Sequence, residues 1–241
     1  MKTKLLLNLL LLVSVTGVAF AQSVIITPKK TVYRRPKPTS SYKKTFTIRY
    51  PMVTGLTPVL NKKVQSSISY TRVSNLNLKE ELGDLQWLEE ADYKVNYNKK
   101  GILDITLSMT GSAAYPSDYS KTVVVDLKTG TRITPKDVFT DLAGLAAMCK
   151  KAQKDEIKTS LAQIKKDEPD AEDPESLFKE ADFKIENLKE FTVSDQGVAF
   201  LYDYGFPHVL EGLQPEGRYL FTWRQIKPFI KSGGLLHQFV R

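Results

Sequence analysis

A run of closely spaced β-strands constrains the fold of this chain more than any other sequence feature. Tyr93, Val95 and Tyr97 alternate with polar residues, and a turn at 98–101 precedes a return strand that starts at Ile102. A loop at 111–118 leads to a third strand at 121–127, and a further turn leads into 131–133. Strands joined by such short connections pair antiparallel, so this region predicts a β-meander rather than a parallel βαβ unit.

Helical patterns lie on both sides of the meander. A strand at 45–50 is followed by a turn formed by Pro51 with Gly55. An apolar residue then recurs every four positions from Leu56 to Ile68, which is typical of a surface helix packed on a sheet. The meander is followed by a short helix at 135–139, a long one from Asp141 to about Lys166 and a short one that begins at Pro174. The remaining predictions are strands at 190–193, 198–202 and 219–223 and a helix at 223–230, with 74–90 unassigned. The sequence therefore predicts an α+β fold with antiparallel β-sheets packed with helices.

Cys149 is the only cysteine of the 241 residues. A single cysteine excludes an intramolecular disulfide and any multi-cysteine zinc site. It falls on the apolar stripe of the long predicted helix, so we expect a small buried core residue and not a nucleophile.

The first 21 residues have the pattern of an export signal. Lys2 and Lys4 precede an apolar run that ends in Ala19, Phe20 and Ala21, the small-x-small pattern of a cleavage site. We therefore expect a signal peptide at 1–21, a mature chain from Gln22 and an extracytoplasmic location, periplasmic or secreted, without stable membrane insertion. The alternative is an uncleaved membrane anchor, although polar residues dilute the run below the ~20 apolar residues that a span prefers.

Charge is unevenly distributed along the chain. Nine of the 35 basic residues and none of the 27 acidic residues lie in positions 1–44, so the remainder is almost neutral despite the net charge of +8. This distribution argues against a nucleic-acid partner. Residues 22–44 are interpreted as a basic extended arm, solvated and proline-containing, and the alternative is weak contact with an anionic envelope surface.

Several segments in a fixed order resemble a known family. The stretch 48–56 with Asn61, then 125–130 with 137–139, and finally 191–200 with the loop 202–217 are similar to the paired extracytoplasmic modules of PdaC-type peptidoglycan deacetylases and RsiV-type anti-sigma factors. The resemblance implies two intertwined or tandem small modules, 45–130 and 131–241, with a single packed unit as the alternative. It also implies a binding or sensory role, with a peptidoglycan fragment or a lysozyme-like protein as the partner. Tyr115 stands where these modules often carry a histidine, so no role of that histidine transfers.

No catalytic signature accompanies this resemblance. His208 and His237 are the only histidines, without an elbow motif, a phosphate-binding glycine loop or metal-ligand spacing, so we expect no enzyme, cofactor or metal. The alternatives are a lysozyme-type hydrolase inhibitor and an enzyme with two carboxylates. Aromatic side chains on two loops can stack on sugars or anchor a protein partner, or can close the core. These candidate binding residues are Tyr115, Tyr119, Tyr202, Tyr204, Phe206 and His208.

Overall fold

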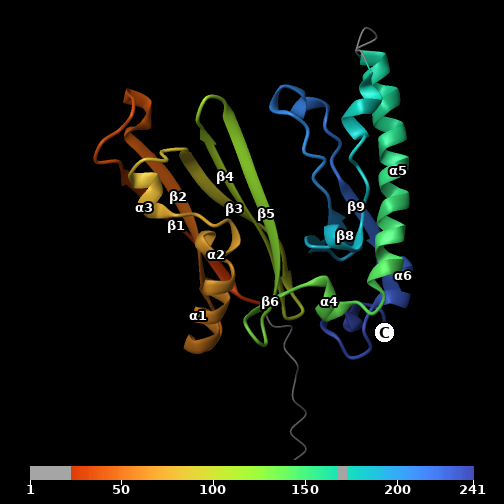
Figure 1. The fold of residues 1–241 in the computed structure, drawn as a ribbon. Helices are drawn as coiled ribbons and strands as arrows, with labels where there is room; N and C mark the ends of the chain where they lie inside the picture. Colours follow the sequence, from red (N-terminus) through yellow and green to blue (C-terminus); the bar gives the residue numbers. More distant parts are fainter. Residues whose placement is uncertain (1–22, 168–172) are drawn as a thin grey trace, which may run out of the picture.

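The computed structural model describes residues 23–167 and 173–241 of the chain. The predicted signal peptide at 1–21 lies outside the described residues. Figure 1 shows a mixed α+β fold with two sheets, which confirms the predicted fold class. Among the described residues, no helix combines the length and the apolar character that a membrane span requires.

The larger sheet has six strands in the order of the sequence. The predicted meander is confirmed, since β3, β4, β5 and β6 pair antiparallel in succession. β2 pairs antiparallel with β1 and, over Thr47 and Ile48 only, parallel with β3. The strands are β1 (Ile25–Arg34), β2 (Thr45–Thr54), β3 (Leu88–Lys99), β4 (Ile102–Ser112), β5 (Pro116–Asp126) and β6 (Thr131–Ile133).

Three helices contribute to the apolar cluster on one face of this sheet. They are α1 (Pro58–Ser67), α2 (Tyr70–Val73) and α3 (Leu78–Leu82). Val64 and Ile68 of the predicted apolar stripe are fully buried in this cluster. They share it with Ile48 of β2 and with Leu103 and Leu107 of β4. Helix α3 occupies part of the segment 74–90 that the sequence pattern left unassigned, and α2 lies just before that segment.

The second part of the chain packs a smaller sheet on a long helix. It contains α4 (Pro135–Val138), α5 (Leu142–Asp167), β7 (Phe191–Val193), β8 (Gly197–Leu201), β9 (Arg218–Thr222) and α6 (Trp223–Ile226). β8 pairs antiparallel with both neighbours. Cys149 of α5 is fully buried beside the aromatic residues of this sheet, as predicted.

The two sheets share a core at one end. Tyr97, Ile102 and Val124 of the larger sheet belong to the apolar cluster of the second part. β6 lies beyond the predicted boundary at 130/131 but pairs with β5 of the larger sheet. The division into two modules stays a prediction.

The interpretation of residues 22–44 as a solvated arm is wrong for much of the segment. β1 pairs with β2 along ten residues, and the side chains of Arg35 and Lys43 are buried. The Arg35 guanidinium donates to the carbonyl oxygens of Glu81 (2.9 Å), Lys43 (3.0 Å) and Leu88 (2.6 Å) and lies over the Phe46 ring. A charged group tolerates burial when its donors are satisfied in this way, which the charge count could not reveal.

The turn expected from Pro51 to Gly55 starts later than predicted, because β2 continues to Thr54 and the chain bends at Gly55. Proline is tolerated inside a strand where no neighbour needs its missing N–H group. β3 pairs with β2 only at Thr47 and Ile48, so no residue of β3 needs an N–H donor from Pro51.

Candidate functional site: a polar cavity between the two sheets

Alternation along β4 separates an apolar face from a polar face. Leu103, Ile105 and Leu107 point into the core beneath α1–α3, so the residues between them point to the opposite side, here called the outer face. On that face Ile102 still joins the shared core, whereas the next two positions are Asp104 and Thr106. The sheets therefore pack tightly near Ile102 and are lined by polar groups beyond it.

A cavity of about 400 Å³ lies where this polar part of the outer face meets the smaller sheet. Figure 1 shows β5 facing the smaller sheet, with α5 on the far side of that sheet. We call this space the inter-sheet cavity, and its lining comes from β3, β4 and β5 on one side and from the smaller sheet and its turn on the other. The lining residues are Lys94, Val95, Asn96, Thr106, Thr122, Thr192, Val193, Ser194, Leu201 and Arg218.

Asp104 joins the two sheets beside this cavity. Its carboxylate accepts hydrogen bonds from Asn96 Nδ2 (2.9 Å) of β3 and from the Thr192 hydroxyl and Val193 N (2.7 Å) of β7. The residue is fully buried, and burial raises the pKa of its carboxyl group although these hydrogen bonds and the Arg218 charge act to lower it.

A β-bulge aims Asn96 at this carboxylate. In the register, Val95 lies opposite Ile105 and Tyr97 lies opposite Asp104, so Asn96 is the extra residue of β3. Its amide nitrogen reaches Asp104 and also Thr106 Oγ1 (2.9 Å), and Thr106 is hydrogen-bonded to Thr122 (2.8 Å). Bulges re-aim side chains and are frequent beside functional sites.

Two cations face the same space from different sheets. Lys94 lies opposite Thr106 in the register, and Arg218 opens β9. Within the described residues, neither side chain forms a hydrogen bond or an ion pair, and the Arg218 charge attracts the Asp104 carboxylate. The cavity therefore combines hydroxyl groups, an amide and two uncommitted positive charges.

Further acidic residues at the junction of the sheets are already paired. Glu190 accepts from Thr122 N (2.6 Å) and forms an ion pair with Lys121 (2.6 Å). Asp195 pairs with Lys99 (2.6 Å), which lowers its carboxyl pKa. Among the described residues, no group of three or more His, Cys, Asp or Glu side chains could hold a metal ion.

Solved structures of similar shape bear on this architecture. A member of the DUF3298 family from Bacteroides fragilis superposes with a TM-score of 0.58 at 12% identity, over 91% of this chain and 98% of that one. A DUF3298 family protein from Pseudomonas aeruginosa gives a TM-score of 0.60 at 11% identity, over 88% and 96%. The chain has the fold of these DUF3298 proteins.

The likeness to the DUF3298 proteins concerns the fold alone, because the identities are low. No protein-family model matches the sequence. No curated protein matches it either. The resemblance to PdaC-type and RsiV-type modules stays a prediction, now on a chain with a DUF3298-type fold.

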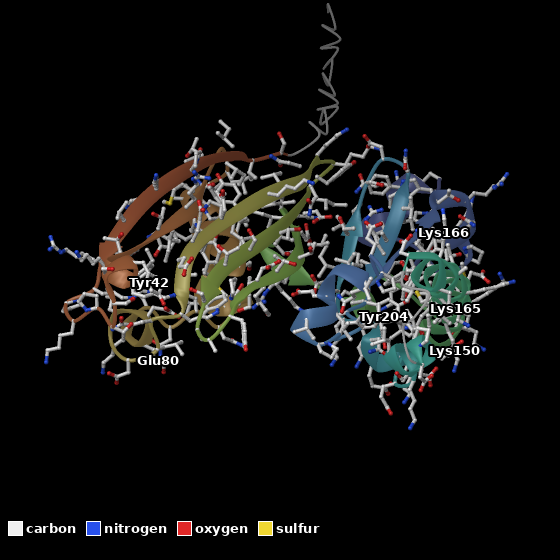
Figure 2. The ribbon with its side chains drawn as sticks, turned by 90° about the horizontal axis from the view of Figure 1, so that it is seen from above. Tyr42, Glu80, Lys150, Lys165, Lys166 and Tyr204 are labelled. Carbon is white, nitrogen blue, oxygen red and sulfur yellow. The ribbon has the colours of Figure 1, made fainter. Side chains whose placement is uncertain are left out.

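The predicted aromatic loop at 202–208 packs against other elements of the second part. Tyr204 donates to Glu156 of α5 (2.8 Å), lies 3.0 Å from the Tyr219 hydroxyl and is half-buried, and burial raises its pKa. Phe206 is buried against Phe178, with their ring centres 5.2 Å apart. Figure 2 shows Tyr204 beside the helix that carries Lys150, Lys165 and Lys166. Tyr202 is partly buried against the apolar cluster that the second part shares with the larger sheet, and nothing is described of the His208 side chain.

Tyr115 and Tyr119 belong to a different surface. Tyr119 lies opposite Met109, which is buried in the core beneath α1–α3, so its side chain is on the face away from the inter-sheet cavity. Tyr115, in the β4–β5 turn, is 70% exposed. The structure therefore does not unite the two predicted aromatic groups, and neither group lines the inter-sheet cavity. Whether they bind a partner stays a prediction.

Sequence reasoning missed the cavity, although one signal was present. Asp104 directly follows Ile102 on the outer face of β4, next to the shared core, and an acidic residue is unfavourable there unless it has partners. The partners Thr192 and Val193 are almost ninety residues away, so their proximity could not be read from the chain.

Proposed function

We propose that this protein is a non-catalytic binding module of the cell envelope, working outside the cytoplasm, that recognises a peptidoglycan fragment in the inter-sheet cavity. The observation that carries the proposal is the composition of this cavity, in which side chains from both sheets converge on one space of small-ligand size. Hydroxyl and amide groups such as Thr106, Thr122 and Asn96 are suited to the hydroxyl and amide groups of such a glycan.

The surroundings of Asp104 support binding over hydrolysis. A two-carboxylate hydrolase needs a second acid facing the first across the bond to be cleaved. Among the described residues that line the cavity, none is Asp or Glu, and both Asp104 oxygens already accept hydrogen bonds. We therefore assign Asp104 to holding the sheets together at the base of the site.

The extracytoplasmic part of the proposal rests on the sequence. The segment 1–21 has the charge and hydropathy pattern of an export signal. The resemblance to PdaC-type and RsiV-type modules supplies the cell-wall context. Retention of residues 1–21 by the mature protein in the envelope fraction would contradict the expected cleavage before Gln22.

Calorimetric titration of residues 22–241 with soluble peptidoglycan fragments tests the proposal. We expect saturable binding that weakens in Thr106→Val, which keeps the side-chain shape but removes a hydroxyl group of the cavity. Thr110→Val is the matched control, because Thr110 lies on the same face of β4, exposed and outside the cavity lining. Absence of binding, or equal weakening by both substitutions, would contradict a fragment site in this cavity.

A lysozyme-like protein is the second candidate partner, with the module acting as its sensor or inhibitor. The observation in its favour is Tyr115, an exposed aromatic side chain at the turn of the long β4–β5 hairpin, which projects from the sheet in Figure 1. Titration with an animal-type lysozyme should give one-to-one binding that Tyr115→Ala weakens. Val59→Ala, at an exposed apolar residue of α1, should leave this binding unchanged.

A further inference from the structure

The inter-sheet cavity offers hydrogen-bond donors to a ligand. Thr106 Oγ1 accepts from Asn96 and shares one hydrogen bond with Thr122 Oγ1. Only one of the two threonine hydroxyl hydrogens can lie in that bond, so the other is free of any partner among the described residues. A ligand oxygen acting as acceptor can take this hydrogen.

The carboxylate acceptors at the base of the site are already engaged on the protein side. Asp104 Oδ1 accepts from Asn96, and Oδ2 accepts from Thr192 and from Val193 N. Because Asp104 is fully buried, its negative charge lies behind the cavity wall and not on the surface that a ligand meets. Lys94 and Arg218, in contrast, are exposed and line the cavity.

Two positive charges with uncommitted donors select for an anion. Lys94 offers up to three N–H groups from β3, and the Arg218 guanidinium offers five from β9. They come from different sheets, so a ligand that contacts both bridges the two walls of the cavity. Since no described side chain neutralises Lys94, an anionic group in the cavity would supply the missing counter-charge.

From this arrangement we infer that the inter-sheet cavity binds a carboxylate on a small hydroxylated ligand, with Lys94 and Arg218 as the carboxylate clamp and the Thr106–Thr122 pair as donor to a neighbouring ligand oxygen. The inference rests on the proposed function for the location of the site and adds the chemical class of the ligand. The planar fork of arginine matches a carboxylate in a bidentate geometry. The adjacent threonine hydroxyls favour a ligand that carries further oxygen acceptors beside its charge.

The test is a titration of residues 22–241 with four simple probes, monitored by amide chemical shifts. Glucuronate carries a carboxylate on a hydroxylated ring, glucose is its neutral counterpart, acetyl-alanyl-alanine carries a peptide carboxylate, and inorganic phosphate is a different anion. We expect glucuronate to shift amides of β4 and β9 saturably and glucose to have no such effect. Binding of the peptide as well would identify any carboxylate as sufficient, and binding of glucuronate alone would identify a sugar acid.

Substitutions of the two cations test the clamp directly. Lys94→Met and Arg218→Met should each weaken glucuronate binding about tenfold or more, because each removes a charge-assisted hydrogen bond. Lys128→Met is the control, since Lys128 is exposed in the β5–β6 turn and does not line the cavity. All three substituted residues are exposed, and an unchanged melting temperature would confirm that the variants fold.

Several results would overturn the inference. The inference fails if glucose binds as tightly as glucuronate. It also fails if Arg218→Met and Lys94→Met both keep full affinity for glucuronate, or if phosphate binds while neither carboxylate probe does. Failure of this inference is separable from failure of the proposed function. Fragment binding that depends on Thr106 but not on Arg218 would support the binding site and contradict the carboxylate clamp. Glucuronate binding that depends on Lys94 and Arg218, without any binding of peptidoglycan fragments, would support the clamp and contradict the proposed ligand.

Discussion

Removal of the Asp104 carboxylate should loosen the junction between the two sheets. In Asp104→Ala, Asn96, Thr192 and Val193 lose their shared acceptor. Asn96 is exposed and Thr192 is partly exposed, so their groups can turn toward water, but Val193 is buried and its N–H group cannot. The unsatisfied N–H group is therefore the main cost that the substitution leaves behind.

The magnitude follows from these partners. A buried donor left unsatisfied costs about 1–3 kcal/mol, and a hydrogen bond to a charged group contributes about 1.5–3 kcal/mol. Removing a buried carboxylate also relieves its desolvation, which offsets part of this loss. We expect Asp104→Ala to lower the free energy of unfolding by about 2–4 kcal/mol, a large share of the ~5–15 kcal/mol typical of a protein.

The cost should depend on pH with a defined sign. The folded-state pKa of Asp104 is raised by burial. At any pH between the unfolded-state pKa of about 3.9 and this raised pKa, the folded protein therefore holds more protons than the unfolded chain does. The contribution of this residue is thus fully present at low pH and declines as the pH rises through that window. We expect Asp104→Ala to cost more near the lower end of the window than at neutral pH.

Urea unfolding measured by tryptophan fluorescence provides the assay. Trp87 reports on the larger sheet and Trp223 on the second part, and coincident transitions would justify a two-state treatment. Asp118→Ala is the matched control, because Asp118 is exposed on the same face of the larger sheet and should change stability by no more than about 0.5 kcal/mol. Equal stability of the two variants would refute the assignment, and a cost that grows with pH would refute the sign.

Three further predictions concern other parts of the fold. Arg35→Met should destabilise the protein by about 3–5 kcal/mol because it leaves buried carbonyl groups and a carboxylate without their cation, whereas Arg34→Met at an exposed position should change stability by under about 0.5 kcal/mol in the same unfolding assay. Gly217→Ala should cost more in melting temperature than Gly205→Ala; both have positive φ, but only the first would drive a Cβ into the backbone oxygen of Tyr202. Cys149 should resist a maleimide at pH 8 in the native state and react in urea, because burial raises its pKa to about 12; rapid native labelling detected by mass spectrometry would contradict its burial.

Local patterns were sufficient for the elements with strong periodicity. The alternation around Tyr93 and Val95 placed the meander, and the four-residue repeat through Val64 placed α1. Cys149 was assigned to the core from its position on a helical stripe alone. These features depend on side chains close in sequence, so hydropathy periodicity records them directly.

The candidate site could not be predicted in the same way. Asn96 enters it through a bulge, which shifts the face of a strand by one residue and leaves no periodic signal. The aromatic residues that suggested a site, Tyr204 and Phe206, pack largely into the second part of the protein. Aromatic residues such as these occur both in binding loops and in cores, and only the residues that surround them in the folded protein distinguish the two roles.

Local patterns along the chain were enough to predict the fold class, the order of most strands and helices, and the burial of Cys149, because each follows from the preference of a short segment for water or for the core. Packing between distant segments buries Arg35, adds β1 to the sheet and brings Asp104 to β7 beside Lys94 and Arg218. A charged residue has the same local pattern whether solvated or buried. Its place is set by partners that approach from distant parts of the chain and satisfy its charge and hydrogen bonds.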